Sequence, residues 1–150
     1  MCTLRYSNDS LFGVMKTETS YVYYIETKTV VDDVFNQTLN VLLDELKNAA
    51  ADGDSNKKFA EKIVKVIDES SSNETIYGLA QCTPDLTKQD CTECFDSARE
   101  QFSYWCKQMK GCFYYGQSCS LRYETTPLSI NANNNTESPA PQPSVELPPK

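Results

Sequence analysis

The cysteines are the residues of this chain whose type and spacing could support chemistry. The sequence holds seven of them, and two form the Cys-x-x-Cys motif Cys91-Thr92-Glu93-Cys94. Such a motif could be redox-active, could supply half of a zinc site or could contribute to disulfides. The βαβ pattern of a redox motif does not precede it, and the sequence lacks the second Cys-x-x-Cys that a Cys₄ zinc site needs. Disulfides are therefore the favoured interpretation, zinc is the weaker one, and we expect neither metal nor cofactor.

The composition excludes several classes of function. The sequence contains no histidine, which removes the commonest general base and every Ser-His or Cys-His arrangement. A net charge of −7 provides no electrostatic basis for binding nucleic acid or anionic membranes. No apolar run is long enough to span a bilayer. We expect a protein that is not an enzyme, binds no nucleic acid and does not insert into a membrane.

A motif that occurs twice indicates a repeat. Cys2-Thr3-Leu4-Arg5-Tyr6 recurs as Cys119-Ser120-Leu121-Arg122-Tyr123, 117 positions further along, which is about the length of one domain. The interpretation is that residues 1–14 are the C-terminal remnant of an upstream repeat, with Cys2 unpaired, and that residues 15–128 form a complete domain. Residues 129–150 are rich in Asn, Ser and Pro and predict an extended linker or stalk.

Two features indicate export from the cell. Small domains with many cysteines are typical of secreted proteins, because the cytosol keeps thiols reduced. Four sequons for N-linked glycosylation add weaker support. Their acceptor residues are Asn8, Asn36, Asn73 and Asn134. We expect a secreted or extracellular protein, although the N-terminus has no apolar stretch that could serve as a signal peptide.

Hydrophobic periodicity predicts a mixture of helices and strands. Residues 34–51 follow an acidic start, Asp32-Asp33, and carry apolar residues at helical spacing, so they predict a helix. A second helix is predicted from about Asp90 to Trp105, whereas residues 59–68 fit either a helix or a strand. The predicted extended segments are Ser20–Ile25, Thr75–Cys82, Gly111–Tyr115 and Gln117–Thr125.

The six cysteines of the predicted domain are Cys82, Cys91, Cys94, Cys106, Cys112 and Cys119. Their number allows many pairings, and spacing alone does not choose among them. The pattern Cys82-x₈-Cys91-x₂-Cys94, entered by residues 77–86 (YGLAQCTPDL) and followed by Gly111-Cys112 and residues 118–124 (SCSLRYE), resembles the ginkbilobin-homologous cysteine-rich domain. Plants place that domain, usually in tandem, outside the membrane in cysteine-rich receptor-like kinases, plasmodesmal proteins and secreted repeat proteins.

The resemblance implies an α+β fold in which two helices pack on one face of an antiparallel sheet of about five strands. It implies disulfides from Cys82 to Cys91 and from Cys94 to Cys119. In many members the residue matching Cys106 bonds a cysteine near the N-terminus of the domain. Residues 20–51 contain no cysteine here, so Cys112 is the expected partner of Cys106.

The resemblance also raises the question of carbohydrate binding. The namesake of the family is an antifungal lectin that binds mannose through an Asn, an Arg and a Glu. Glu124 occupies the Glu position and is the candidate carbohydrate-binding residue. Phe113 occupies the Arg position, and the Asn follows an N-terminal cysteine that this domain lacks. Because two of three polar partners are missing, we expect Glu124 to be a solvated carboxylate at a strand end.

Two groups of aromatic residues could either form a binding platform or alternate into the core, and the core is the favoured interpretation. The first group consists of Tyr104, Trp105, Tyr114 and Tyr115. The second consists of Tyr21, Tyr23 and Tyr24.

Together these features predict a non-catalytic extracellular recognition module, on the apoplast side of the plasma membrane. It would be part of a cysteine-rich receptor-like kinase ectodomain or of a tandem-repeat secretory protein acting in stress or defence signalling. Its partners would be an extracellular protein or carbohydrate ligand and the upstream repeat, against which it would pack. The alternative is a free-standing secreted antifungal or mannose-type carbohydrate-binding protein.

Overall fold

The computed structural model of the chain describes residues 6–18, 20–25, 32–54, 57–67 and 74–127. These residues form five strands and two helices. In chain order the elements are β1 (Ser20–Tyr24), α1 (Asp33–Ala51), β2 (Phe59–Lys65), β3 (Thr75–Cys82), α2 (Lys88–Trp105), β4 (Gly111–Gly116) and β5 (Cys119–Glu124).

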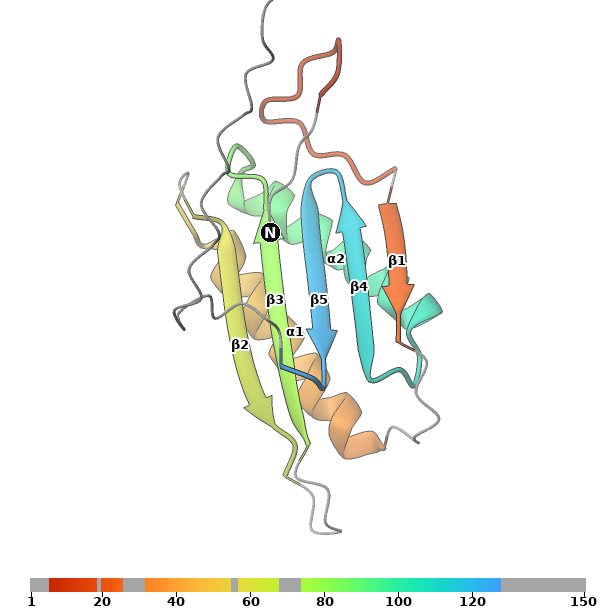
Figure 1. Cartoon of the computed structure of the whole chain (residues 1–150). Helices are drawn as coiled ribbons and strands as arrows, with labels where there is room; N and C mark the ends of the chain where they lie inside the picture. The colour runs from red at the N-terminus through yellow and green to blue at the C-terminus, as the bar shows by residue number, and fades with distance from the viewer. Residues whose placement is uncertain (1–5, 19, 26–31, 55–56, 68–73, 128–150) are drawn as a thin grey trace, which may run out of the picture.

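The five strands form one sheet in the order β1-β4-β5-β3-β2, and every neighbouring pair is antiparallel. Both helices lie on the same face of this sheet, and no helix of the described residues covers its other face (Figure 1). The α+β fold that the resemblance implied is confirmed. We call the helix-covered side the inner face and the other side the outer face.

Both helices begin at capping residues. The Asp32 carboxylate accepts a hydrogen bond from the Phe35 backbone N–H at 2.7 Å, so α1 begins one residue earlier than predicted. The Thr87 hydroxyl accepts from the Asp90 backbone N–H at 3.1 Å, and α2 therefore begins at Lys88 rather than near Asp90. The predicted boundary placed residues 86–89 before the helix, and the prediction therefore did not identify Thr87 as the N-cap.

Tertiary pairing resolves the segment that the sequence left ambiguous. Residues 59–65 form β2, an edge strand whose seven residues all pair with β3. Ala60 and Val64 face α1, whereas Ile63 is 54% exposed. The last strand also differs from the prediction, since it begins at Cys119 and not at Gln117. Residues 117 and 118 belong to the turn of the β4–β5 hairpin.

The core lies between the inner face and the two helices. Alternate residues of the central strands point into it, and Tyr114, Leu121 and Tyr123 are almost fully buried. Gly78 allows α1 to approach β3 closely, because a Cβ atom at this position would lie 2.5 Å from the Leu46 Cδ1 atom.

The chain on both sides of the predicted boundary between residues 14 and 15 contacts the domain. The Gly13 backbone N–H donates to the Asp85 carboxylate at 2.6 Å, and the Lys16 N–H donates to the Ser118 hydroxyl at 2.8 Å. The division at residue 14 stays a prediction. Cys2 and the predicted linker of residues 129–150 lie outside the described residues.

Candidate functional site

Three disulfides among the described residues attach α2 to the sheet along its length. Cys82 at the end of β3 is bonded to Cys91 in the first turns of α2. Cys94 is bonded to Cys119 at the start of β5, and Cys106 at the C-terminal cap of α2 is bonded to Cys112 on β4. All six sulfurs belong to buried residues. The first two are the pairs that the resemblance implies, and the third is the pair expected in this chain, where residues 20–51 contain no cysteine.

Two further features of the described part of the chain concern metal-binding clusters and helices of membrane-spanning length. No group of three or more Cys, Asp or Glu side chains there is arranged to hold a metal ion. Neither of the two described helices is long and apolar enough to cross a bilayer.

Glu124 is not the solvated carboxylate that we expected, since it is only 5% exposed. Its Oε1 atom accepts from the Arg122 Nε–H at 2.8 Å and also from Arg122 Nη2. Its Oε2 atom accepts from the Thr126 hydroxyl at 3.1 Å. Arg122 and Glu124 are two positions apart on β5, so both side chains project onto the outer face and meet there.

Phe113 contributes to the same cluster from the neighbouring strand. It pairs directly with Arg122 in the β4–β5 register, and its ring centre lies 4.1 Å from the Arg122 guanidinium carbon. Where the lectin has an arginine, this chain therefore has a phenylalanine packed against an arginine that comes from β5. Sequence reasoning did not select Arg122 as a site residue, although its i, i+2 relation to Glu124 was a usable signal.

The outer face also carries exposed aromatic side chains, and the prediction that they enter the core is wrong for most of them. Tyr21 and Tyr23 on the edge strand β1 are 62% and 58% exposed. The Tyr23 and Tyr115 rings meet edge-to-face at 6.1 Å, and Phe113 stacks with Tyr115 at 6.2 Å. We call Tyr21, Tyr23, Phe113 and Tyr115 the outer aromatic patch.

The other aromatic residues divide between core and surface. Tyr114 is 1% exposed, as expected for a core residue. Tyr24 is 42% exposed because it lies on an edge strand. Tyr104 and Trp105 are 76% and 50% exposed at the C-terminal end of α2, where their rings meet edge-to-face. Alternation in sequence thus identified only part of the buried aromatic set, because it does not show which face of the sheet the helices cover or which side of α2 faces solvent.

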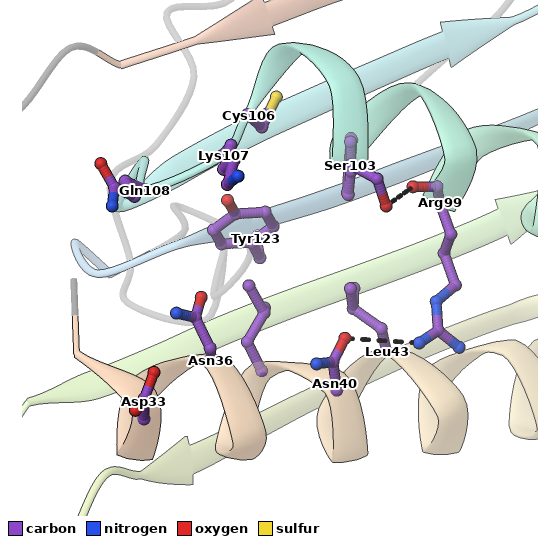
Figure 2. A pocket seen from close by; sticks show the side chains of 12 residues that line it. Asp33, Asn36, Asn40, Leu43, Arg99, Ser103, Cys106, Lys107, Gln108 and Tyr123 are labelled. Carbon is purple, nitrogen blue, oxygen red and sulfur yellow. Dashed lines mark hydrogen bonds between the residues drawn. The ribbon is translucent and has the colours of Figure 1, made fainter.

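A groove of about 520 Å³ lies between α1 and α2 on the inner side of the sheet (Figure 2). Leu43, Phe102 and Tyr123 form its apolar base, and the Phe102 and Tyr123 rings meet edge-to-face at 5.5 Å. The Tyr123 hydroxyl donates to the Met109 carbonyl at 3.0 Å. Burial raises the pKa of Tyr123 far above the ordinary value of a phenol.

Polar side chains line the mouth of this groove. Asn36 and Asn40 project from α1 into it, and Ser103 faces them from α2 (Figure 2). The Arg99 guanidinium also lines the groove, but it is held by the Asp44 carboxylate and lies 3.5 Å from the Asn40 Oδ1 atom. Gln108 lies at one end with a φ of 65°, a backbone conformation that residues other than glycine adopt rarely.

The predicted glycosylation sites differ in their surroundings. Asn8 is exposed, whereas Asn36 is half-buried on the groove side of α1. Asn73 and Asn134 lie outside the described residues.

The fold and the three disulfides of α2 together define the class of small, disulfide-bonded α+β domains. Residues 24–126 match the family model described as salt stress response/antifungal, and the chain belongs to that family. The resemblance seen in the sequence is thereby confirmed.

Two curated relatives show the contexts in which the family occurs. The chain is 33% identical over 144 residues to cysteine-rich receptor-like protein kinase 29 of Arabidopsis thaliana, an alignment that covers 95% of the chain and 21% of the kinase. It is 34% identical over 127 residues to an antimicrobial ginkbilobin-2-like protein of Castanea crenata, covering 85% of the chain and 50% of that protein. The chain thus spans between about a fifth and a half of these relatives.

A solved structure has the same fold. The tandem DUF26 ectodomain of the Arabidopsis thaliana cysteine-rich receptor-like protein PDLP8 superposes with a TM-score of 0.58 at 24% identity. The superposition covers 71% of this chain and 48% of that ectodomain.

Proposed function

We propose that this chain is a non-catalytic extracellular recognition module that works as one repeat of a larger protein. That protein would be a cysteine-rich receptor-like kinase or a tandem-repeat secretory protein acting in stress or defence signalling. The observation that carries the proposal is the outer aromatic patch, in which Tyr21 and Tyr23 are exposed and adjoin the half-buried Phe113 and Tyr115. Solved structures of the same fold include tandem ectodomains. Contiguous exposed apolar surface of this kind marks an interaction site.

In this proposal the outer aromatic patch packs against the upstream repeat. The Cys-x-Leu-Arg-Tyr motif at residues 2–6 supports such a repeat. The hydrogen bonds of Gly13 and Lys16 hold the connecting segment on the domain, which keeps the two repeats close and raises their effective concentration. A ligand, whether protein or carbohydrate, would be bound by the assembled pair.

The mannose-type alternative is less well supported. Both Glu124 carboxylate oxygens already accept hydrogen bonds from within the domain. Phe113 replaces the arginine that the lectin uses, and the guanidinium of Arg122 is engaged by Glu124 and by the Phe113 ring. A sugar would have to replace these contacts in order to bind at this position.

The test uses the protein with its upstream repeat, secreted with its disulfides intact. The double substitution Tyr23→Lys with Tyr115→Lys would place charges inside the docked surface. We expect it to lower the Tm and to separate one cooperative unfolding transition into two. Tyr104→Lys, an exposed aromatic on α2, is the matched control. Equal Tm values for both variants and the parent would contradict docking through this face.

A second measurement separates the two candidate functions. The mannose-type alternative requires that the protein is retained on immobilised mannose and that Glu124→Gln abolishes the retention. The recognition-module proposal requires that Glu124→Gln leaves the retention unchanged, since Glu124 is a structural residue in it.

A further inference from the structure

The groove between α1 and α2 is separate from the surface assigned above. Residues of α1 and α2 line it, and both helices lie on the inner face of the sheet (Figure 1), whereas the strand register places the outer aromatic patch on the opposite face. A repeat that docks on the outer face would therefore leave the groove open. Its volume of about 520 Å³ is within the range of pockets that hold small organic groups, roughly 300–1,000 Å³.

The lining of the groove suits an uncharged, hydroxyl-rich group. The Asn40 and Gln108 carboxamides can each both donate and accept hydrogen bonds, as can the Ser103 hydroxyl. The charges around the groove balance, because the Asp44 carboxylate pairs with Arg99 and the other charged lining residues, Lys107 and Asp33, are of opposite sign. The lining therefore has no excess of positive charge that would select a phosphate or sulfate, whereas sugar hydroxyls match the amides and the C–H faces of a sugar match the apolar base.

The sequence supplies a covalent attachment point on the wall of this groove. Asn36 begins the sequon Asn36-Gln37-Thr38, and its side chain points into the groove toward Tyr123 (Figure 2). The backbone of the acceptor is held by a hydrogen bond from its N–H to the Asp32 carbonyl at 3.1 Å. A sugar joined to this side chain would start inside the groove mouth.

We propose that Asn36 carries an N-linked glycan whose innermost N-acetylglucosamine residues lie in the groove between α1 and α2. The Asn36 Nδ2 atom forms a bond to the anomeric carbon of the sugar and loses a proton. The bond from that carbon to a lipid pyrophosphate donor of the secretory pathway breaks, and the lipid pyrophosphate leaves with the electron pair. The transfer takes place before folding, so the helix does not obstruct it. The proposal depends on the proposed function in one respect only, which is that the protein must enter the secretory pathway.

Because the first sugars are buried between the helices, the glycan contributes to the packing of the domain. The bond between the two innermost sugars is the one that endoglycosidases cut, and the groove shields it. A glycan on the exposed Asn8 has no such cover. The two sites therefore provide a protected glycan and an unprotected reference within one chain.

The experiment treats the secreted full chain with endoglycosidase in its native state and follows each glycopeptide by mass spectrometry. We expect cleavage at Asn36 to be at least about tenfold slower than at the same site after reduction and denaturation, which corresponds to roughly 1.4 kcal/mol of protection. Cleavage at Asn8 is expected to change little. Asn40→Ala, which removes a groove amide but keeps the sequon, is expected to speed native cleavage at Asn36. Asn48→Ala, on the exposed part of α1, is the matched control.

Two results would overturn the proposal. One is an Asn36 that carries no glycan in the secreted protein, and the other is an Asn36 glycan that is cleaved as fast in the native as in the denatured state. The readout does not involve the outer face, so a failure of repeat docking would not change it.

Discussion

The Arg122 guanidinium lies over the Phe113 ring, 4.1 Å from its centre, while the same side chain pairs with Glu124. The contact joins β4 and β5 on the outer face, and the side chain of Glu124 is only 6% exposed there. A cation packed between a ring and a buried carboxylate stabilises a specific arrangement of the two strands. This relationship explains why Glu124 has a structural role here, although it occupies the position of a sugar-binding glutamate in the lectin.

Removing the charge of Glu124 should destabilise the domain. Glu124→Gln leaves the partly buried Arg122 without its counter-charge, and we expect a loss of about 1–3 kcal/mol in the free energy of unfolding. Urea unfolding followed by circular dichroism measures it. Glu61→Gln, at an exposed position of the edge strand β2, is the control and should change stability by less than about 0.5 kcal/mol. Similar losses in the two variants would show that the Arg122 pair has no special role.

A methyl group at Gly78 should force α1 away from β3. The added Cβ would lie 2.5 Å from the Leu46 Cδ1 atom and 3.1 Å from the Leu42 Cδ2 atom. We expect Gly78→Ala to lower stability by about 1–3 kcal/mol, as overpacking does. In a double-mutant cycle with Leu46→Ala, the combined loss should be smaller than the sum of the single losses, because the truncated side chain makes room. Strict additivity would show that the clash is relieved elsewhere.

The disulfides should contribute to stability in the order of the loops that they close. Cys94–Cys119 joins residues 25 apart, whereas Cys106–Cys112 joins residues 6 apart. The chain-entropy relation gives roughly 3.5 kcal/mol for the longer loop and roughly 2.4 kcal/mol for the shorter one. Replacing both cysteines of the longer loop by alanine should therefore lower the Tm more than the same change in the shorter loop. The reverse order of Tm values would rule out loop closure as the main term.

Full reduction should loosen or unfold the domain. The three bonds together rival the whole stability expected of a domain of this size, about 5–15 kcal/mol. Thermal unfolding in excess reductant measures the effect. An unchanged Tm, with all thiols shown to be free, would contradict it.

Stability should fall at high pH because of Tyr123. Burial raises its pKa far above the ordinary 10.0, so the folded state holds the phenol proton more tightly than the unfolded state. Its contribution is therefore fully present below pH 10 and is lost as the pH rises from there through the folded pKa. Urea unfolding across this range should show a steeper decline for the parent than for Tyr123→Phe, which also loses about 1 kcal/mol from the bond to Met109. Parallel declines would assign the effect to other groups.

The local signals of the sequence were sufficient for most elements. The apolar spacing of residues 34–51 identified α1 because a helix buries every third or fourth residue. The cysteine pattern, together with residues 77–86 and 118–124, was enough to indicate the family by resemblance. The segment that became β2 could not be assigned, because a short apolar run packs as well in a helix as in a strand until a partner strand is present.

The sequence by itself determined the class of fold and the family, and its cysteines and sequons predict an extracellular protein. Only the tertiary structure decided which face of the sheet the helices leave open, and hence that Tyr21 and Tyr23 are exposed. It also brought Arg122 across to Phe113 and placed Asn36 on the wall of the groove. The physical reason is that hydrophobic periodicity indicates only which residues of one helix or strand share a face. Which side becomes buried depends on the elements that pack against it from distant parts of the chain.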